Sequence, residues 1–413
     1  MRILMVNQYA VEPGYPGGTR HYSLCRELIR RGHDVKLIAT SFNHATRSDT
    51  RLRHDEIWRE ELCGEVPFLW CRSPNYKGNT AGRLWNMLVF AFRVWRGIGW
   101  KKRWKPDIVI GSNPQLFAAL ASERIASRLG VPFVMEIRDL WPQTFIDMGA
   151  MSPRHPLSLC FAVIERHVYH RAQAIISLLP LAAEHVAKKG EDASKVVWIP
   201  NGIDIDMLPA PRPPPDDNVF TVMYTGSHSK SDDLDTLLNT AELLSRDPRA
   251  STIRFVLIGD GPEKGNLQAR VANANLNNVL FRGPVPKSEL FNVMNEADAF
   301  IVMVKDMPIY RYGASFNKFF DYLAMARPTV MAANIPRNPF LESGSGICVG
   351  PSDSVALAEA CLVLAKMPSI QRQSMGTAGR KFVEEHHSMT LLAARLEGVL
   401  LDAMKYTSFK ETL

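Results

Sequence analysis

The loop from Glu12 to Arg20 carries glycines where a bound phosphate group would need them. It follows the apolar run Ile3 to Val6, lies at the amino end of an amphipathic stretch, and contains Gly17 and Gly18. Glycine lets backbone amides approach a ligand, and the amino end of a helix favours negative charge. We therefore expect Gly17 and Gly18 to contact a diphosphate. The alternative is an ordinary tight turn between a strand and a helix.

A second glycine loop follows the apolar run Phe220 to Tyr224. There Gly226 and Ser227 precede Lys230, so a glycine, hydroxyl groups and a cation meet where a phosphate would sit. A flexible ammonium group neutralises a leaving diphosphate. We expect this role for Lys230, and the alternative is a solvated surface lysine. The dinucleotide spacing G-x-G-x-x-G is absent, and the similar run Gly259 to Gly265 has its third glycine one place late, which disfavours a nicotinamide enzyme.

A third group of polar and small residues lies at the start of a predicted helix. Its members run in the order Gly313, Ala314, Ser315, Phe316, Asn317 and Lys318. Asp321 follows one turn beyond Asn317 on the same helical face. Backbone amides, a cation and a carboxylate would then converge on one point. The alternative is a helix that Ser315 caps, with Asp321 in solvent.

Apolar runs alternate with amphipathic stretches, and this alternation predicts how the three loops are held. The expected strands are Ile3–Val6, Val35–Ala39, Ile108–Ile110, Phe133–Ile137, Phe220–Tyr224, Phe255–Ile258, Val279–Phe281, Ala299–Val304 and Thr329–Ala332. Strands that alternate with helices predict a parallel sheet covered on both faces. Prolines interrupt the pattern between residues 199 and 218. We therefore predict two α/β domains, each a doubly wound Rossmann-like sheet, facing each other across a cleft.

The composition is that of a globular, basic protein. The 413 residues include 49 lysines and arginines against 42 acidic residues, a formal net charge of +7. This length predicts two or three domains, and the charge predicts an anionic partner such as a phosphate, a nucleotide or a membrane. The six cysteines form neither a C-x-x-C pair nor a zinc spacing, so they predict no zinc site. No metal is expected at the phosphate site either, because lysines there can supply the charge. No window supplies the ~20 apolar residues of a membrane-spanning helix.

Cationic and aromatic residues are mixed from Trp95 to Lys105. This mixture suits an anionic bilayer surface, and we expect the segment to touch a membrane. The alternative is a solvated basic tip on a core helix, and Met87 to Phe92 are expected to belong to that core. Nucleic acid is not an expected partner, because no DNA-binding or RNA-binding module accompanies the segment.

Four segments, in their order and spacing, carry a resemblance to a known family. They are Pro16–Arg20 with Arg31–Val35, Arg138–Pro142, Ile258–Glu263 and Ser315–Tyr322. Together they resemble the GT-B retaining glycosyltransferases of family four, and within them the bacterial O-antigen and capsule group that includes L-fucosamine transferase-like proteins. The resemblance implies an acceptor-binding domain at 1–198, to which 385–413 return, a linker at 199–218, and a nucleotide-sugar-binding domain at 219–384.

The resemblance also implies roles for the residues that bind the donor. Asp321 matches the second acid of the family's E-x7-E motif, which binds the ribose hydroxyls, whereas Gly313 stands in place of the first acid. The amides of residues 315–318 would hold the diphosphate, and Lys230 and Lys318 would balance its charge. The loop with Val285 and Pro286 would take part in stacking on the base.

Many relatives have a His-Asp pair where this chain has Arg138 and Asp139. Arginine keeps its proton in proteins, so Arg138 would position a substrate or stabilise charge rather than act as a base. The resemblance then implies that the leaving diphosphate takes the proton of the acceptor. The alternative is a buried structural Arg-Asp pair.

The activity implied by the resemblance is retaining transfer of a sugar from a nucleotide sugar to a lipid-linked saccharide. The expected donor is a UDP-linked N-acetyl or deoxy amino sugar, with no metal and no other cofactor. The expected acceptor is an undecaprenyl-diphosphate-linked saccharide of a bacterial surface polysaccharide or lipopolysaccharide, met at the inner face of the cytoplasmic membrane. Two alternatives stay open: an epimerase or phosphorylase of the same fold, and a non-catalytic membrane adaptor, which the missing acid at Gly313 would fit.

Overall fold

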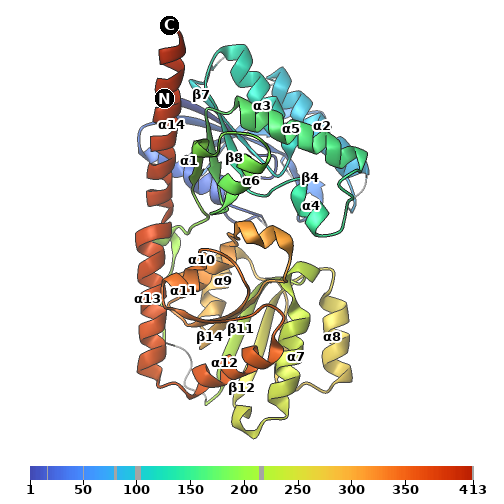
Figure 1. The fold of residues 1–413 in the computed structure, drawn as a ribbon, viewed down its shortest axis with the longest axis vertical. Coiled ribbons are helices and arrows are strands. Elements are labelled where there is room, and N and C mark those ends of the chain that lie inside the picture. The colour runs from blue at the N-terminus through green and yellow to red at the C-terminus, as the bar shows by residue number, and fades with distance from the viewer. Residues whose placement is uncertain (16, 50, 79–80, 98–103, 214–217, 412–413) are drawn as a thin grey trace. The chain divides into compact units, whose positions relative to one another are not determined.

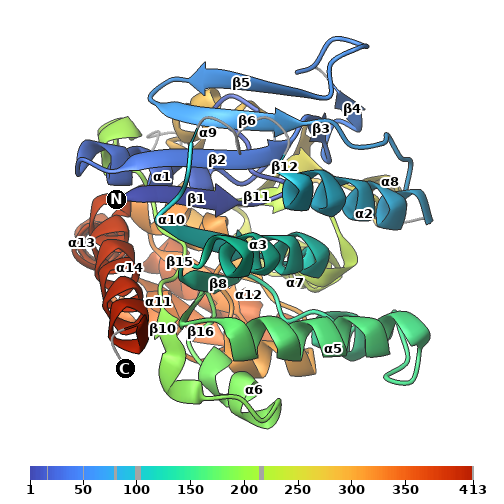
Figure 2. The same ribbon diagram turned by 90° about the horizontal axis from the view of Figure 1, so that it is seen from above.

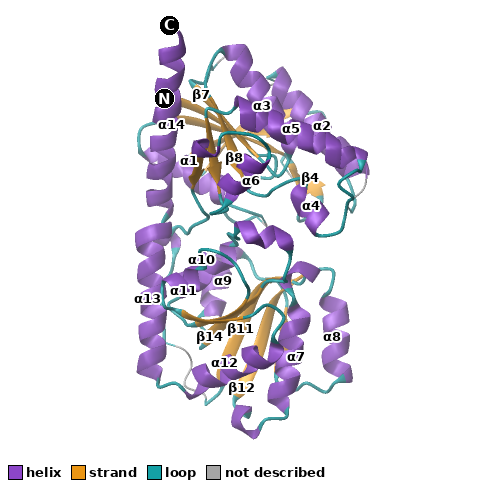
Figure 3. Ribbon diagram, in the orientation of Figure 1, coloured by secondary structure: helices purple, strands orange, loops and turns teal. Residues whose placement is uncertain are grey.

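The chain divides into two compact units (Figures 1 and 3). The computed structural model describes all residues except 16, 50, 79–80, 98–103, 214–217 and 412–413. The first unit comprises residues 1–200 and 389–413, and the second comprises residues 201–388. Each unit is built around its own largely parallel sheet. The two-domain α/β architecture predicted from the sequence is therefore confirmed.

The first unit contains an eight-stranded sheet in the order β10-β9-β8-β7-β1-β2-β6-β5. Seven of its strands run parallel: β1 (Arg2–Val6), β2 (Asp34–Thr40), β6 (Val66–Cys71), β7 (Ile108–Ser112), β8 (Phe133–Ile137), β9 (Ala174–Ser177) and β10 (Val196–Trp198). The edge strand β5 (Trp58–Cys63) pairs antiparallel with β6. Between β2 and β5 along the chain, β3 (Phe42–Asn43) and β4 (Ser48–Asp49) form a separate two-stranded antiparallel sheet. The four strands that the sequence predicts in this unit are β1, β2, β7 and β8.

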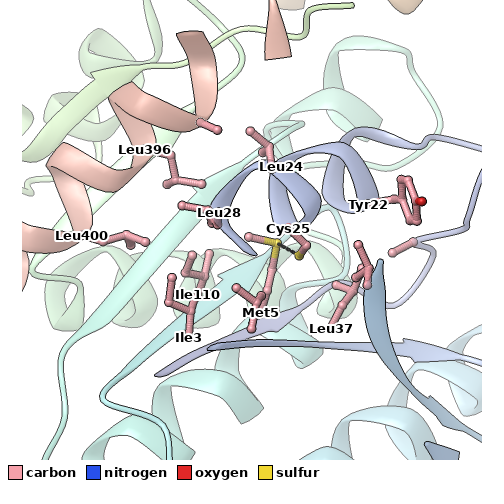
Figure 4. Packing of buried hydrophobic residues seen from close by; sticks show 14 of the residues in the cluster. Ile3, Met5, Tyr22, Leu24, Cys25, Leu28, Leu37, Ile110, Leu396 and Leu400 are labelled. Atoms are coloured by element: carbon pink, nitrogen blue, oxygen red, sulfur yellow. Dashed lines mark hydrogen bonds between the residues drawn. The ribbon is translucent and has the colours of Figure 1, made fainter. Parts of the chain in front are cut away.

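Helices cover both faces of the first sheet. They are α1 (Arg20–Arg30), α2 (Ala81–Arg96), α3 (Leu116–Leu129), α4 (Gln143–Asp147), α5 (Pro156–Arg171), α6 (Ala182–Lys188) and α14 (Met389–Glu411). On one face, Leu28 of α1 packs with Ile3 of β1 and Leu396 of α14 in a single buried cluster (Figure 4). Helix α14 thus completes a core that began at the other end of the chain. Figure 2 shows α2, α3 and α5 side by side in this unit.

The second unit contains a six-stranded parallel sheet in the order β13-β12-β11-β14-β15-β16. The strands are β11 (Phe220–Ser227), β12 (Ile253–Asp260), β13 (Val279–Arg282), β14 (Ala299–Met303), β15 (Thr329–Ala332) and β16 (Gly346–Val349). The helices are α7 (Leu234–Ser245), α8 (Lys264–Asn273), α9 (Lys287–Met294), α10 (Asn317–Ala324), α11 (Pro339–Glu342), α12 (Ser354–Lys366) and α13 (Ser369–His387). Two separate buried clusters, one with α7 and α12 and the other with α9 and α10, cover its two faces.

The strand order reverses once in each sheet. In the first sheet β1 lies between β2 and β7, and in the second sheet β11 lies between β12 and β14. The connections on the two sides of such a point leave in opposite directions, and doubly wound proteins bind ligands at the strand ends there. The reversals therefore single out the loops after β1 and β7, and those after β11 and β14.

No single helix among the described residues has both the length and the hydropathy of a membrane span. Helices α12 and α13 reach them only as a pair, and they are bent by 113° relative to each other.

Candidate functional site

Two glycine-lined loops pack backbone against backbone at the reversal point of the second sheet. Gly226 and Gly259 are ladder partners at the ends of β11 and β12, and their φ angles are +151° and +144°. A Cβ atom on Gly259 would lie 1.9 Å from the carbonyl oxygen of Gly226, and one on Gly261 would lie 2.4 Å from that of His228. Only glycine allows this approach. The two loops therefore hold each other in place.

Lys318, in the first turn of α10, directs its ammonium group at the Gly226 loop. Its Nζ donates hydrogen bonds to Tyr224 Oη at 2.9 Å and to Asp232 Oδ1 at 2.6 Å. The same Nζ would lie 3.1 Å from a Cβ atom on Gly226. Burial raises the pKa of Tyr224, so its hydroxyl stays neutral and donates to the carbonyl of Ser227 at 2.6 Å. A cation is thus fixed at the loop where the sequence predicts a phosphate.

The amino end of α10 offers unpaired backbone donors. Within the described part of the chain, the amides of residues 314–318 make no hydrogen bond, and Gly313 before them has a φ angle of +98°. Ser315 does not cap the helix, because its Oγ accepts a hydrogen bond from the amide of Asn201 at 2.8 Å. Asn201 Nδ2 also donates to the carbonyl of Ser315 at 2.5 Å. The expected alternative of a Ser315 cap is therefore wrong, and the free amides favour an anion.

Asp321 is buried rather than solvated, with 8% of its surface exposed. Lys287 Nζ lies 2.7 Å from both of its carboxylate oxygens. Lys287 is the first residue of α9 and directly follows Val285 and Pro286. The loop predicted to stack on a base therefore lies beside the carboxylate predicted to hold a ribose. Sequence reasoning missed Lys287, because the two residues are 34 positions apart.

Lys230 and His228 differ from Lys318 in their surroundings. Lys230 begins the 3₁₀ turn η3 (Lys230–Asp232), is exposed, and has no hydrogen bond or ion pair among the described residues. His228 is fully buried, and neither ring nitrogen has a hydrogen-bond partner. Its ring centroid lies 6.1 Å from that of Tyr224 and 5.8 Å from that of Phe281. Burial and the nearby Lys264 lower its pKa, so the ring is neutral.

In the first unit, Arg138 reaches the glycine loop after β1. A Cβ atom on Gly18 would lie 3.3 Å from Arg138 Nη2, and Gly17 has a φ angle of +144°. Arg138 Nε is buried without a hydrogen-bond partner. Burial lowers the pKa of Arg138, while Glu136 opposes this shift, and the guanidinium keeps its charge. The structure thus brings three residues singled out from the sequence to one reversal point.

The carboxylate of Asp139 is hydrogen-bonded to residues of its own loop. Its carboxylate accepts hydrogen bonds from the amide of Leu140 at 2.9 Å, from Thr144 Oγ1 at 2.5 Å and from Trp141 Nε1 at 3.2 Å. Burial raises the pKa of this carboxyl group, and these bonds oppose the rise. Among the described residues, none of the hydrogen bonds and ion pairs of this carboxylate goes to Arg138. Asp139 therefore shapes the turn into α4 and makes no direct contact with Arg138, although each of the two charges favours the charged form of the other.

A buried network behind the glycine loop was not predicted from the sequence. Arg20 Nε donates to Glu136 Oε1 at 2.9 Å, and His21 Nε2 lies 2.6 Å from Glu136 Oε2. Burial alone would raise the pKa of Glu136, but His21 and Arg20 hold it well below its usual value. Arg20 Nη2 also donates to the carbonyl of Ile199 at 2.9 Å. Because the side chains of Arg20 and Glu136 are each 2% exposed, the network positions α1 rather than a substrate.

Two family models match the chain and together span most of it. A "Glycosyl transferase 4-like domain" matches residues 17–202, and "Glycosyl transferases group 1" matches residues 219–367. The chain belongs to the GT-B glycosyltransferases of family four. At the level of the family, this confirms the resemblance that the four sequence segments carry.

Two curated proteins are similar to this GT-B glycosyltransferase. One is the putative colanic acid biosynthesis glycosyl transferase WcaI of Escherichia coli K12, 24% identical over 62% of this chain and 64% of that protein. The other is 2-deoxystreptamine glucosyltransferase of Streptomyces kanamyceticus, 23% identical over 56% of this chain and 66% of that protein. The alignments span just under two thirds of each relative's length.

Solved structures share the fold of this glycosyltransferase over nearly its whole length. Sucrose-phosphate synthase from Thermosynechococcus elongatus has a TM-score of 0.74 at 15% identity, covering 98% of this chain and 99% of its own. HepE from Anabaena, solved with UDP and glucose, has a TM-score of 0.68 at 15% identity and covers 96% and 98%. The lipopolysaccharide outer core galactosyltransferase WaaB has a TM-score of 0.64 at 15% identity and covers 97% and 99%. The predicted GT-B fold is confirmed.

Proposed function

We propose that this GT-B glycosyltransferase moves a sugar from a UDP-sugar to a saccharide acceptor. The observation that carries the proposal is the convergence of Lys318, the unpaired amides of residues 314–318 and the carboxylate of Asp321 around one helix end. A cation with free amides suits a diphosphate, and a carboxylate suits the two hydroxyl donors of a ribose. The solved complex of HepE with UDP-glucose supports this choice of donor.

Within this proposal, each of the predicted donor-site residues in the second unit contacts a stated part of the donor. The backbone at Gly226, Ser227, Gly313 and Ala314–Lys318 lines the diphosphate. The Lys318 ammonium exchanges part of its contact with Asp232 for the phosphates, and the unpaired Lys230 adds charge as the sugar bond breaks. Asp321 exchanges Lys287 for the ribose hydroxyls, and Val285 and Pro286 contact the base. Two lysines replace the charge that a metal ion would supply, so the transfer is metal-independent.

The first unit is proposed to bind the acceptor. Gly18 leaves room for the guanidinium of Arg138, and Gly17 beside it packs closely on Val11. The guanidinium stabilises negative charge but cannot remove a proton. Three hydrogen bonds hold the Asp139 carboxylate within its own turn, so Asp139 is not proposed as the base. The leaving diphosphate is then the group that accepts the proton of the attacking hydroxyl. Attack on the side that the diphosphate leaves retains the configuration of the sugar.

The acceptor is proposed to be an undecaprenyl-diphosphate-linked saccharide of a bacterial surface polysaccharide, O-antigen or capsule. The likeness to WcaI and WaaB supports this choice, and a UDP-linked N-acetyl or deoxy amino sugar is the proposed donor. Such an acceptor places the enzyme on the inner face of the cytoplasmic membrane. The segment Trp95–Lys105, expected to touch that membrane, lies partly outside the described residues, since 98–103 are not described.

Measurement of UDP release tests this function. A panel of UDP-sugars is incubated with the protein, with and without lipid-linked saccharide acceptors, and the product is analysed for the configuration of the new bond. The proposal predicts release that depends on the acceptor and an unchanged anomeric configuration. Turnover of the donor without any acceptor would instead favour an epimerase or a hydrolytic activity, and nucleotide binding with no turnover on any acceptor would favour the adaptor.

A further inference from the structure

One side of α2 is apolar and exposed. Trp85, Leu88, Phe92 and Trp95 are exposed to 59%, 38%, 56% and 37%. Their spacing of three, four and three residues places them in one stripe along the helix. An exposed stripe of large apolar side chains on a globular protein marks a surface that contacts another molecule. We call these four residues the α2 stripe.

The core does not account for the α2 stripe. The buried apolar residues of α2 are Met87, Phe90, Ala91 and Val94, which lie on the other side of the helix. The prediction that Met87 to Phe92 belong to the core is thus correct for Met87, Phe90 and Ala91 and wrong for Leu88 and Phe92, which are exposed. A helix that only covers its own sheet needs one apolar face, and α2 has two.

Cations border the α2 stripe, and α2 contains no acidic residue. The sequence of α2 includes three arginines, of which Arg96 is exposed at its end. On the neighbouring helix α3, the guanidinium of Arg128 lies 5.1 Å from the ring centroid of Trp95 and donates to the Trp95 carbonyl at 3.3 Å. Arg124, one turn earlier on α3, is also exposed. Exposed arginines therefore border the end of the stripe at Trp95.

We infer that the α2 stripe docks on the anionic surface of a lipid bilayer. Tryptophan rings prefer the headgroup region, leucine and phenylalanine side chains reach the acyl boundary, and arginines bind anionic headgroups. A second copy of this chain fits less well, because two such faces would place arginines opposite arginines with no acid on α2 to pair with them. A nucleic acid would leave Leu88 and Phe92 in water. This inference deepens the proposed membrane location by naming the surface and the lipid charge.

The test compares matched variants of the full chain on vesicles. One variant, Trp85→Glu with Phe92→Glu, places charge in the α2 stripe. The control, Val355→Glu with Ile370→Glu, makes the same change at side chains of α12 and α13 that are 63% and 70% exposed. Binding is measured by flotation with phosphatidylcholine vesicles that contain or lack phosphatidylglycerol. The wild type and the control are expected to bind only the vesicles with phosphatidylglycerol, and the stripe variant at least about tenfold more weakly.

A charge variant completes the test. Arg96→Gln with Arg128→Gln is expected to weaken binding roughly fivefold for each cation removed. Equal vesicle binding by the stripe variant and the control would overturn the inference. A stripe variant with half the molecular mass of the wild type in light scattering would also overturn it, because the stripe would then bind a second copy of the chain. So would a stripe variant that loses binding to single-stranded DNA while its binding to vesicles is unchanged. UDP affinity and thermal unfolding, unchanged in all variants, show that they are folded. Because no assay here uses turnover, failure of this inference leaves the proposed transfer to its own test.

Discussion

Replacement of Lys318 by methionine is the most informative single change at the candidate site. The Lys318 ammonium lies within hydrogen-bond distance of Tyr224 Oη and Asp232 Oδ1, and its side chain is 15% exposed. A hydrogen bond to a charged group contributes about 1.5–3 kcal/mol, so losing one such bond to a phosphate weakens UDP binding roughly 10- to 150-fold. Methionine keeps most of the apolar stem, which limits changes in packing.

The matched control is Lys230→Met, which removes the same charge from an exposed and unpaired position nearby. Exposed charge pairs contribute ~0.2–1 kcal/mol, so UDP affinity is expected to fall less than about fivefold. Turnover is expected to fall further than affinity, because charge on the diphosphate grows as the sugar bond breaks. Isothermal titration with UDP and steady-state rates with a UDP-sugar measure the two quantities separately.

A second substitution distinguishes a phosphate ligand from a structural ion pair. Lys318→Met leaves the carboxylate of Asp232 unpaired beside the phosphates, so adding Asp232→Asn should restore part of the UDP affinity. A purely structural ion pair predicts a different result. In Lys318→Met and in Asp232→Asn alike, the loss of UDP affinity would then be proportional to the loss of thermal stability. The reasoning would be refuted by a Lys318→Met protein that binds UDP as tightly as the wild type.

Three other predictions concern neighbouring residues. Asp321→Ala is expected to weaken UDP binding about tenfold and to abolish the preference for UDP over 2′-deoxy-UDP; a preference that survives would remove Asp321 from the ribose. Gly259→Ala is expected to lower the free energy of unfolding of the second unit by at least ~2 kcal/mol in urea titrations, because its Cβ atom would meet the Gly226 carbonyl oxygen at 1.9 Å; wild-type stability would contradict the close packing. Burial lowers the pKa of His228 from 6.5, so below pH 6.5 the unfolded chain binds more protons than the folded chain. As the pH drops from 6.5 to the folded pKa, the free energy of unfolding is expected to fall by up to about 1.4 kcal/mol for each pH unit. His228→Phe should flatten this dependence, and an equally steep slope in the variant would assign it to other groups.

Most parallel strands could be predicted, because they are apolar runs that end at glycine or polar turns. The nine expected strands all occur, and none of their ends differs from the expected position by more than three residues. The edge strand β5 escaped prediction because three consecutive charged residues, Arg59 to Glu61, interrupt its apolar residues at the margin of the sheet. Strand β6 was missed although it is apolar, since Pro67 argues against a strand. Pro67 lies at the start of β6, before the pairing with β2 begins at Phe68.

The site was predictable where it depends on local sequence, and not where distant residues meet. The glycine loops and the helix start at Asn317 are local patterns, and the structure puts them at reversal points of the two sheets. The partners of the charged groups are set by packing instead. Asp232 and Lys318 are 86 positions apart, and no spacing rule connects them. The same holds for Asn201, which takes the hydroxyl of Ser315 that a cap would have used.

A crystal structure of the protein with a non-transferable UDP-sugar tests the central claim most directly. We expect the diphosphate within hydrogen-bond distance of the amides of residues 316–318 and of Lys318 Nζ, with both ribose hydroxyls on the carboxylate of Asp321 in place of Lys287. A nucleotide bound elsewhere, or a bound nucleotide that leaves the Lys287–Asp321 and Lys318–Asp232 pairs unchanged, would contradict the account.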